Sequence, residues 1–289
     1  RELLLQWQQL LTRAAADRLN THPKPLRDPK ALTCWNALLV IGFAEAHRSL
    51  PEKGYDQAAT SLLDTLLNTV WQNGAIAHQY LKDTAEGDGF LDDYSSFGRA
   101  LLEGFLLTGN SMYLERAHEL AERIERVFPF EGDFRVYTPA VDAAWQKQLE
   151  IEDNVIPSAN SMWAHFFQYL GVIADRNDWK EQAQLALRAV HSKVFRYGPN
   201  FSNWLELGLM RAYGAKELVI TGSGAKAAAE ELQRAHYQPG TLVLFSESAA
   251  ELAHFKGRVG HTLTYYLCSN NTCQLPTTDL NELLKLWMA

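Results

Sequence analysis

Two adjacent carboxylates, Asp92 and Asp93, stand between a glycine-rich turn and a run of apolar residues at helical spacing. Small residues separate the apolar ones, a pattern typical of a helix that is enclosed on most sides. The free N–H groups at a helix start favour negative charge. Two interpretations therefore remain open. The carboxylates face a cleft and do acid–base chemistry, or Asp92 is an N-cap and Asp93 a first-turn residue that only stabilises the helix.

A second acidic pair, Glu152 and Asp153, precedes another apolar run that contains Ser161 and His165. Glycoside hydrolysis needs two carboxyl groups, one as acid and one as nucleophile or base. We therefore predict Asp93 and Asp153, at equivalent places in successive units, as the catalytic pair. Epimerisation next to a carbonyl would instead need proton-transferring bases, usually histidines. His165 is the best such histidine, but the Asp93 helix has no equivalent one, which weighs against an epimerase mechanism.

Polyhydroxylated ligands need many hydrogen-bonding groups and flat aromatic faces. Several candidates also have a structural interpretation. Asp28 could be a helix cap before Pro29, Ser158 could mark a helix start, and the tryptophans and His165 could be core residues. The predicted substrate-binding residues are Asp28, Trp35, Asn36, Asp92, Tyr94, Ser158, Asn160, Ser161, Trp163 and His165.

Apolar helices that look buried alternate with amphipathic helices that look exposed. The buried type starts near residues 30, 93, 158 and 203, with a repeat of about 65 residues, which is the signature of a helical array or ring. Residues 130–150 interrupt the alternation and could hold a short hairpin or an inserted loop. The predicted helices span residues 1–19, 30–48, 55–71, 93–107, 113–128, 158–174, 179–194 and 203–213.

After Gly214 the pattern changes to short β-type runs separated by helices. Strands are predicted at 216–221, 241–245 and 262–268, and helices at 225–236 and 279–287. This order favours a small α/β appendage packed on the helical part. We therefore predict a helical-hairpin domain over residues 1–214 and an α/β appendage over residues 215–289.

Four segments carry a family resemblance: RDPKALTCWN (27–36), GFLDDY (89–94), NVIPSANS (154–161) and YLCSNNTCQLP (266–276). In this order they resemble the YyaL-type, spermatogenesis-associated thioredoxin-like proteins. The resemblance implies an (α/α) toroid similar to six-hairpin glycosidases and N-acylglucosamine 2-epimerases. It also implies an N-terminal thioredoxin-like region, absent here, or a separate chain that supplies it. A closed ring needs twelve helices and eight main ones are predicted, so we expect an incomplete ring, from a C-terminal fragment or a shortened toroid.

The formal net charge of −7, without a run of Lys or Arg, argues against nucleic acid and anionic membranes as partners. No apolar stretch is long enough to suggest a membrane span. The odd, sparse set Cys34, Cys268 and Cys273 does not resemble a secreted disulfide framework, so we expect a cytoplasmic protein. Cys268 and Cys273 could form a disulfide across a hairpin, but free thiols are favoured, and neither a metal site nor a cofactor is predicted.

The leading functional hypothesis is a toroid domain with a carbohydrate-binding or carbohydrate-processing pocket at the inner-helix ends. Its activity would be glycoside hydrolase-like or sugar isomerase- or epimerase-like, on a small sugar-like molecule. One alternative is a non-catalytic ligand-binding or regulatory domain. The other is a helical scaffold that binds protein on its concave face.

Overall fold

The computed structural model describes residues 2–21, 26–139, 148–212, 216–236, 240–247, 255–258, 260–269 and 272–287. The chain divides into two compact units, Arg1–Lys30 and Ala31–Ala289. The first unit contains α1 (Glu2–Thr21), whose described residues are all exposed. The predicted domain boundary between residues 214 and 215 lies outside the described residues and stays a prediction.

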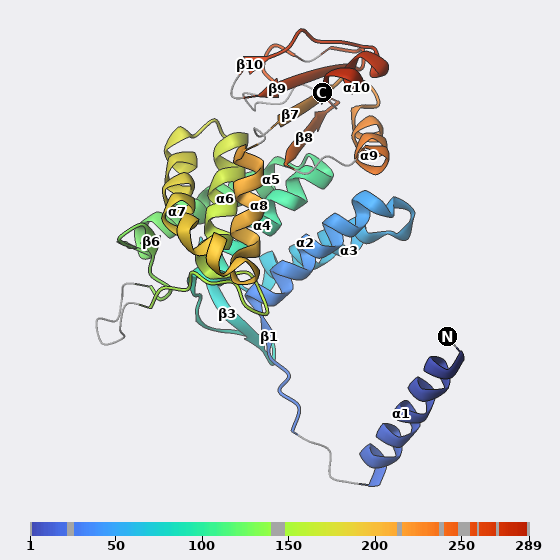
Figure 1. The fold of residues 1–289 in the computed structure, drawn as a ribbon, viewed down its shortest axis with the longest axis vertical. Helices are drawn as coiled ribbons and strands as arrows, with labels where there is room; N and C mark the ends of the chain where they lie inside the picture. Colours follow the sequence, from blue (N-terminus) through green and yellow to red (C-terminus); the bar gives the residue numbers. More distant parts are fainter. Residues whose placement is uncertain are drawn as a thin grey trace. The chain divides into compact units, whose positions relative to one another are not determined.

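The second unit is built on successive helical hairpins, as the 65-residue repeat predicted. In each hairpin an inner helix is followed by an outer one, and the inner helix α4 packs against both inner neighbours, α2 and α6 (Figure 1). The mainly α class and the incomplete (α/α) toroid are confirmed. The hairpins are α2 (Thr33–Ser49) with α3 (Tyr55–Thr69), α4 (Leu91–Thr108) with α5 (Ser111–Val127), and α6 (Ala159–Ile173) with α7 (Asn177–Arg196). The short helices η1 (Pro51–Lys53) and η2 (Gly198–Phe201) precede α3 and α8 (Ser202–Ala212).

Helix α4 is the centre of the array. Nearly every one of its residues is buried, whereas its partner α5 buries a single apolar face. Burial on opposite sides requires small residues where neighbours approach closely. A Cβ atom on Gly98 would lie 2.4–2.8 Å from the ring of Phe166 on α6, and one on Gly104 would lie 2.4 Å from Leu63 on α3. These two glycines therefore set how closely the hairpins pack.

Replacing Gly98 with alanine should destabilise the chain by about 1–2 kcal/mol, because the ring of Phe166 must move in a closely packed core. Gly42 is a matched control, since it also lies inside an inner helix but a Cβ atom there meets nothing within 4 Å. Gly42→Ala should be neutral or stabilising by up to about 1 kcal/mol. Urea denaturation of both variants measures the difference, and equal effects would contradict the proposed close contact.

A β-hairpin that the sequence did not predict joins α3 to α4. Strands β2 (Trp71–Gln72), β3 (Ala75–Leu81) and β4 (Thr84–Asp88) form a sheet with β1 (Ala31–Leu32), which precedes α2. Lys82 and Asp83 make the β3–β4 turn with positive φ angles. The irregular region after α5 begins with a second, shorter hairpin, β5 (Phe130–Glu131) and β6 (Phe134–Arg135). Residues 140–147 of that region lie outside the described residues.

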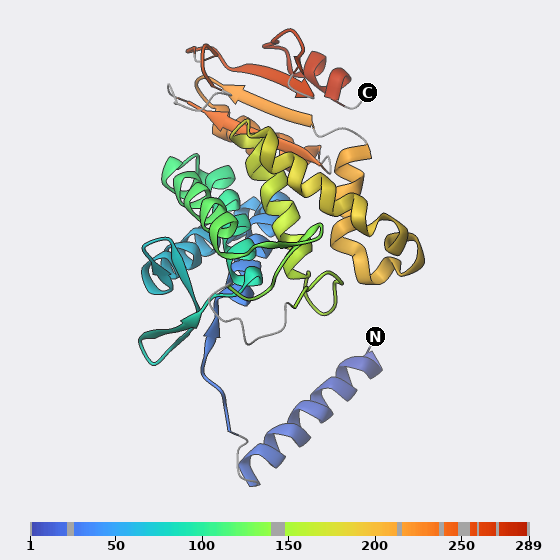
Figure 2. The ribbon, with the colours of Figure 1, turned by 90° about the vertical axis from the view of Figure 1, so that its left-hand side faces the viewer.

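The C-terminal part is a four-stranded sheet in the order β10-β9-β7-β8. Its two faces bury different cores: one packs with the helical hairpins, and the other is covered by α9 (Ala225–Ala235) and α10 (Leu280–Trp287). Figure 2 shows the sheet next to the helical hairpins. The α/β appendage is therefore confirmed. Strand β7 (Lys216–Thr221) pairs parallel with β8 (Thr241–Ser246) and antiparallel with β9 (Thr264–Ser269), which pairs with β10 (Thr272–Cys273).

The favoured prediction of free thiols at Cys268 and Cys273 was wrong, because the two residues form a disulfide. They lie directly opposite each other in the antiparallel pair of β9 and β10, with their Cα atoms 3.9 Å apart. Cys34 is buried and free. No helix in the described ranges has the length and apolar character needed to cross a bilayer.

Candidate functional site

Asp93 ties three elements together at the start of α4. Its side chain is fully buried and accepts hydrogen bonds from the backbone N–H of Cys34 on α2 (2.9 Å) and of Phe90 (3.0 Å). The Nδ1 atom of His78 on β3 lies 2.8 Å from Oδ2 of Asp93. Because a carboxylate only accepts, His78 donates from Nδ1, which fixes the tautomer and orientation of its ring. Asp93 thus brings the starts of α2 and α4 and the middle of β3 to one place.

Asp92 is only partly buried, and its carboxylate accepts from the backbone N–H of Asp93 (2.9 Å) and contacts the Cys34 thiol. Burial, the neighbouring Asp93 and Glu150 together raise the pKa of the Asp92 carboxyl to about 7. The Tyr137 hydroxyl is hydrogen-bonded to the same carboxyl and opposes the rise. Burial also raises the pKa of Glu150. Asp92 can therefore hold or release a proton near neutral pH, as a general acid or base must.

Aromatic rings link His78 to Tyr137, whose hydroxyl is hydrogen-bonded to Asp92. The ring of Phe90 lies between those of His78 (centroids 4.9 Å apart) and Tyr137 (5.0 Å, stacked). Trp35, next to Cys34 in the first turn of α2, keeps 63% of its surface exposed. A protonatable carboxyl beside flat rings, with one large ring open to solvent, is an arrangement that suits a sugar ring. We refer to Asp92, His78, Tyr137, Glu150 and Trp35 as the α4-end cluster.

Asp153 forms a separate network in front of α6. It is 4% exposed and accepts from the backbone N–H of Ser158 (2.9 Å) and Asn203 (2.9 Å) and from the hydroxyl of Ser161 (2.7 Å). These bonds join the starts of α6 and α8. A cavity of about 260 Å³ adjoins Asp153 and is lined by residues 153–157 together with Ser202, Asn203 and Glu206.

The carboxylates predicted as the catalytic pair are therefore both enclosed and hydrogen-bonded to backbone N–H groups, an arrangement that favours a structural role. Catalysis by Asp93 and Asp153 stays a prediction. The structure adds Asp92, with its raised pKa, as the more accessible carboxyl at the same helix end.

Among the other predicted binding residues, Ser158 is the N-cap of α6, since its hydroxyl accepts from Ser161 N (3.2 Å). Asn160 uses its side-chain amide to hold the backbone of Arg135 and Glu150. The Tyr94 hydroxyl accepts from the backbone N–H of Ile76. All three residues are buried, so their bonds explain their burial without a ligand.

Three further predicted residues lie deeper or are locally satisfied. Trp163 is fully buried in the main core, and the Nε2 atom of His165 lies 2.7 Å from Asn203 O. Burial lowers the pKa of His165, so its neutral ring donates to that carbonyl. Asn36 is partly exposed and donates to Leu32 O. The structural interpretation therefore accounts for Trp163 and His165. Neither side chain is exposed to solvent, so their burial does not support the predicted binding role.

The predicted cap at Asp28 was wrong, and the cap interpretation that was left open for Asp92 does not hold either. Helix α2 begins at Thr33 rather than after Pro29, because Ala31 and Leu32 pair with β3 instead. Asp28 is exposed within the Arg1–Lys30 unit, where it forms an ion pair with Lys30 (3.1 Å). The N-cap of α4 is Phe90 rather than Asp92, and Asp93 at the third helical position accepts the Phe90 N–H.

Sequence reasoning missed His78, Tyr137 and Glu150. Each comes from a hairpin or loop outside α4. Only the folding of that segment back onto α4 brings the residue to the start of the helix. The burial pattern of β3 does not alternate, so no local signal in the sequence pointed to His78. Among the described residues, no group of three or more His, Cys, Asp or Glu side chains is arranged to hold a metal ion.

No protein-family model matches the chain. The chain is similar to human spermatogenesis-associated protein 20, with 25% identity over 299 residues that cover 91% of this chain and 37% of the relative. The mouse protein of the same name is 26% identical over 291 residues, which cover 91% of this chain and 36% of the relative. The predicted family resemblance is confirmed. The chain spans a little over a third of the length of these curated relatives.

Three solved structures share part of the fold. A D-mannose isomerase is 17% identical and covers 57% of this chain and 44% of its own, with a TM-score of 0.45. A family 76 α-mannanase from Bacteroides thetaiotaomicron is 14% identical over 60% and 48%, with a TM-score of 0.48. A cellobiose 2-epimerase from Bacillus thermoamylovorans is 18% identical over 59% and 47%, with a TM-score of 0.46. Each likeness is partial.

Proposed function

We propose that the α4-end cluster binds a carbohydrate-type molecule and exchanges a proton with it through Asp92. The observation that carries the proposal is the convergence at the start of α4. Asp93 fixes His78 and α2, the Tyr137 hydroxyl is hydrogen-bonded to Asp92, and the charge of Glu150 acts on Asp92. The family resemblance, which implies a toroid similar to those of sugar-processing enzymes, supports the same ligand class.

Two reaction types fit the groups in this cluster. Asp92 and Glu150 offer a carboxyl pair for hydrolysis, in which a protonated acid assists departure of the leaving group. Asp92 and the oriented His78 offer two proton-transferring groups for isomerisation or epimerisation next to a carbonyl. Because His78 comes from β3, this pair does not depend on a second histidine in an inner helix.

A panel of sugars tested by thermal shift, proton NMR in D₂O and chromogenic glycoside hydrolysis distinguishes these outcomes. Solvent deuterium entering the carbon next to the carbonyl supports isomerisation or epimerisation, and release of the chromophore supports hydrolysis. Stabilisation without turnover would assign a non-catalytic ligand-binding role. If no sugar raises the melting temperature, the proposal is wrong.

Asp92→Asn should reduce turnover of the ligand identified in this way by about 100-fold, because the amide cannot exchange a proton in its place. Asp83→Asn is the control: this exposed aspartate lies in the β3–β4 turn, and asparagine tolerates its positive φ angle. Turnover that depends on protonated Asp92 should fall as the pH rises through about 7. A loss shared equally by the control would contradict the assignment.

Asp92→Asn should also change how the free energy of unfolding depends on pH. The folded pKa of Asp92 lies above its ordinary value, so the native state binds more protons than the unfolded state between about pH 4 and pH 7. The stability contribution of Asp92 is therefore lost as the pH rises through this range. Solvent screening of this partly exposed group limits the loss to about 1–2 kcal/mol. Asp92→Asn should remove that part of the pH dependence, which urea denaturation at pH 5 and pH 8 measures.

A further inference from the structure

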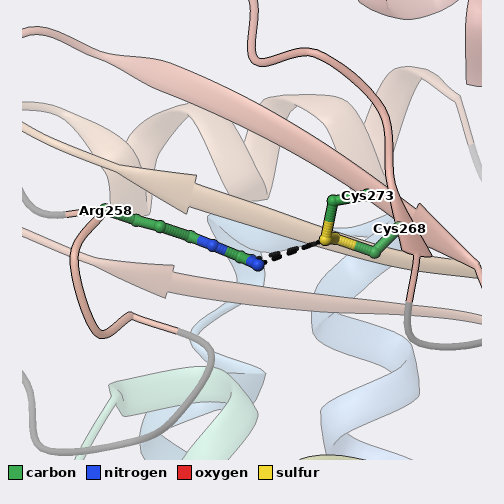
Figure 3. Close-up of a disulfide and its surroundings, with 3 residues drawn as sticks. All are labelled: Arg258, Cys268 and Cys273. Atoms are coloured by element: carbon green, nitrogen blue, oxygen red, sulfur yellow. Dashed lines mark hydrogen bonds between the residues drawn. A yellow bond between two sulfur atoms is a disulfide. The ribbon is translucent and has the colours of Figure 1, made fainter.

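The disulfide between Cys268 and Cys273 stands at the β9–β10 corner of the appendage (Figure 3). Cys268 is 2% exposed, on the sheet face that packs toward the helical hairpins, whereas Cys273 is exposed. A reagent from solvent therefore meets the Cys273 end of the bond first, and the buried Cys268 sulfur is the one that would leave.

Arg258 places a cation at both sulfurs. Its Nη2 atom lies 3.1 Å from Cys273 Sγ and its Nη1 atom 3.8 Å from Cys268 Sγ, and Figure 3 shows the extended side chain pointing at the bond. The sulfurs of a disulfide are weak, neutral acceptors, whereas thiolates are anions that a neighbouring arginine stabilises strongly. The guanidinium is therefore better matched to the reduced, ionised pair than to the disulfide itself.

The position of Arg258 is fixed by contacts independent of the sulfurs. Its backbone carbonyl accepts from the hydroxyls of Thr221 (2.8 Å) and Tyr266 (3.3 Å), and its guanidinium lies 5.1 Å from the centroid of the Tyr266 ring. Glu217 on β7 is the opposing charge, since it pairs in register with Cys268 and so lies on the same face of the sheet. Arg258 has to outweigh this carboxylate for a thiolate to form at Cys268.

We propose that Cys268 and Cys273 form a thiol–disulfide exchange site whose reactant is a small or protein-borne dithiol. The first thiolate of the dithiol attacks Cys273 Sγ, and the bond to Cys268 breaks, with its electron pair leaving on Cys268 Sγ. The second thiolate of the dithiol then attacks the reagent sulfur of this mixed disulfide and releases Cys273 as a thiolate. The dithiol is oxidised to a disulfide, the protein gains two electrons, and the protons released by the dithiol return to the two cysteines. Arg258 stabilises both departing thiolates.

The test compares the native 289-residue chain with Arg258→Gln and with Lys256→Gln, which removes an exposed positive charge from the same turn. Each protein is treated with dithiothreitol without denaturant, quenched by alkylation and digested. Mass spectrometry then measures the peptides that carry Cys268 and Cys273, so that the buried Cys34 is not counted. Circular dichroism follows the fold, and a glutathione redox buffer measures the equilibrium.

We expect Arg258→Gln to slow reduction about five- to tenfold and to shift the equilibrium toward the disulfide, because the leaving thiols become less acidic. Lys256→Gln should match the native chain, and the reduced protein should keep its circular dichroism spectrum. Equal rates for Arg258→Gln and the native chain would overturn the role of Arg258. A bond that resists dithiothreitol, or a chain that unfolds when it is reduced, would show a purely structural disulfide and overturn the proposal.

Discussion

Replacing Glu103 with alanine is expected to lower the free energy of unfolding by about 3–5 kcal/mol, because the change leaves two buried arginines without their shared partner. Glu103 lies on α4 with its side chain fully enclosed, and it forms ion pairs with Arg48 on α2 and with Arg99 one turn earlier on α4. Both arginine side chains are only 10% exposed. Burial alone would raise the pKa of Glu103, but the two guanidiniums outweigh it and lower the pKa overall.

The matched control is Glu119→Ala on the outer helix α5. Glu119 also pairs with an arginine, Arg116 (2.8 Å), but both side chains are 40% exposed or more. Exposed pairs of this kind contribute less than about 1 kcal/mol, so the control should change stability little. Urea denaturation of the two variants compares a buried charge cluster with an exposed one. A loss below that of Glu119→Ala would show that Glu103 does not neutralise the two arginines.

Asp93→Ala should destabilise the chain by about 3–4 kcal/mol, because buried N–H groups that lose their acceptor cost about 1–3 kcal/mol each. The groups left unpaired would be the backbone N–H of Cys34 and of Phe90, and His78 would lose the partner that orients its ring. Asp93→Asn should cost less, since its carbonyl oxygen can still accept from one of the donors.

Asp88→Ala provides the comparison for Asp93, because Asp88 is an exposed carboxylate at the end of β4. We expect its substitution to change stability by no more than about 0.5 kcal/mol. Chemical denaturation gives the free energies, and the His78 side-chain NMR signals report ring orientation. If Asp93→Ala is as stable as Asp88→Ala, Asp93 does not tie α2, β3 and α4 together.

The helices could be predicted closely from the sequence because each inner and outer helix has a distinct burial pattern over several turns. The long apolar α4 and the amphipathic α5 illustrate this, and both ends of each lie within about two residues of the structure. The start of α2 was placed too early, since local capping signals at Asp28 and Pro29 do not reveal that residues 31–32 pair with β3. The β3–β4 hairpin was missed because its strands are largely half-exposed, which weakens their alternation.

The candidate site could be predicted only in part. The sequence identified the adjacent carboxylates, but it could not separate their roles, because neighbouring positions on a helix point in different directions. Asp93 turns inward to the N–H groups of Phe90 and Cys34, and Asp92 stays partly exposed. The partners His78, Tyr137 and Glu150 depend on how a hairpin and a loop fold back on α4. Register likewise decided the disulfide, since C-x₄-C spacing alone left both redox states open.

The central claim is that the start of α4 holds Asp92 in surroundings that keep its proton near neutral pH. Carbon-13 NMR titration of the side-chain carboxyl groups tests it most directly, with Asp92→Asn used to assign the signal. The structure predicts a midpoint at about pH 7 for Asp92. A midpoint near 4, the ordinary value for an aspartate, would contradict the claim and remove the basis for proton exchange at this site.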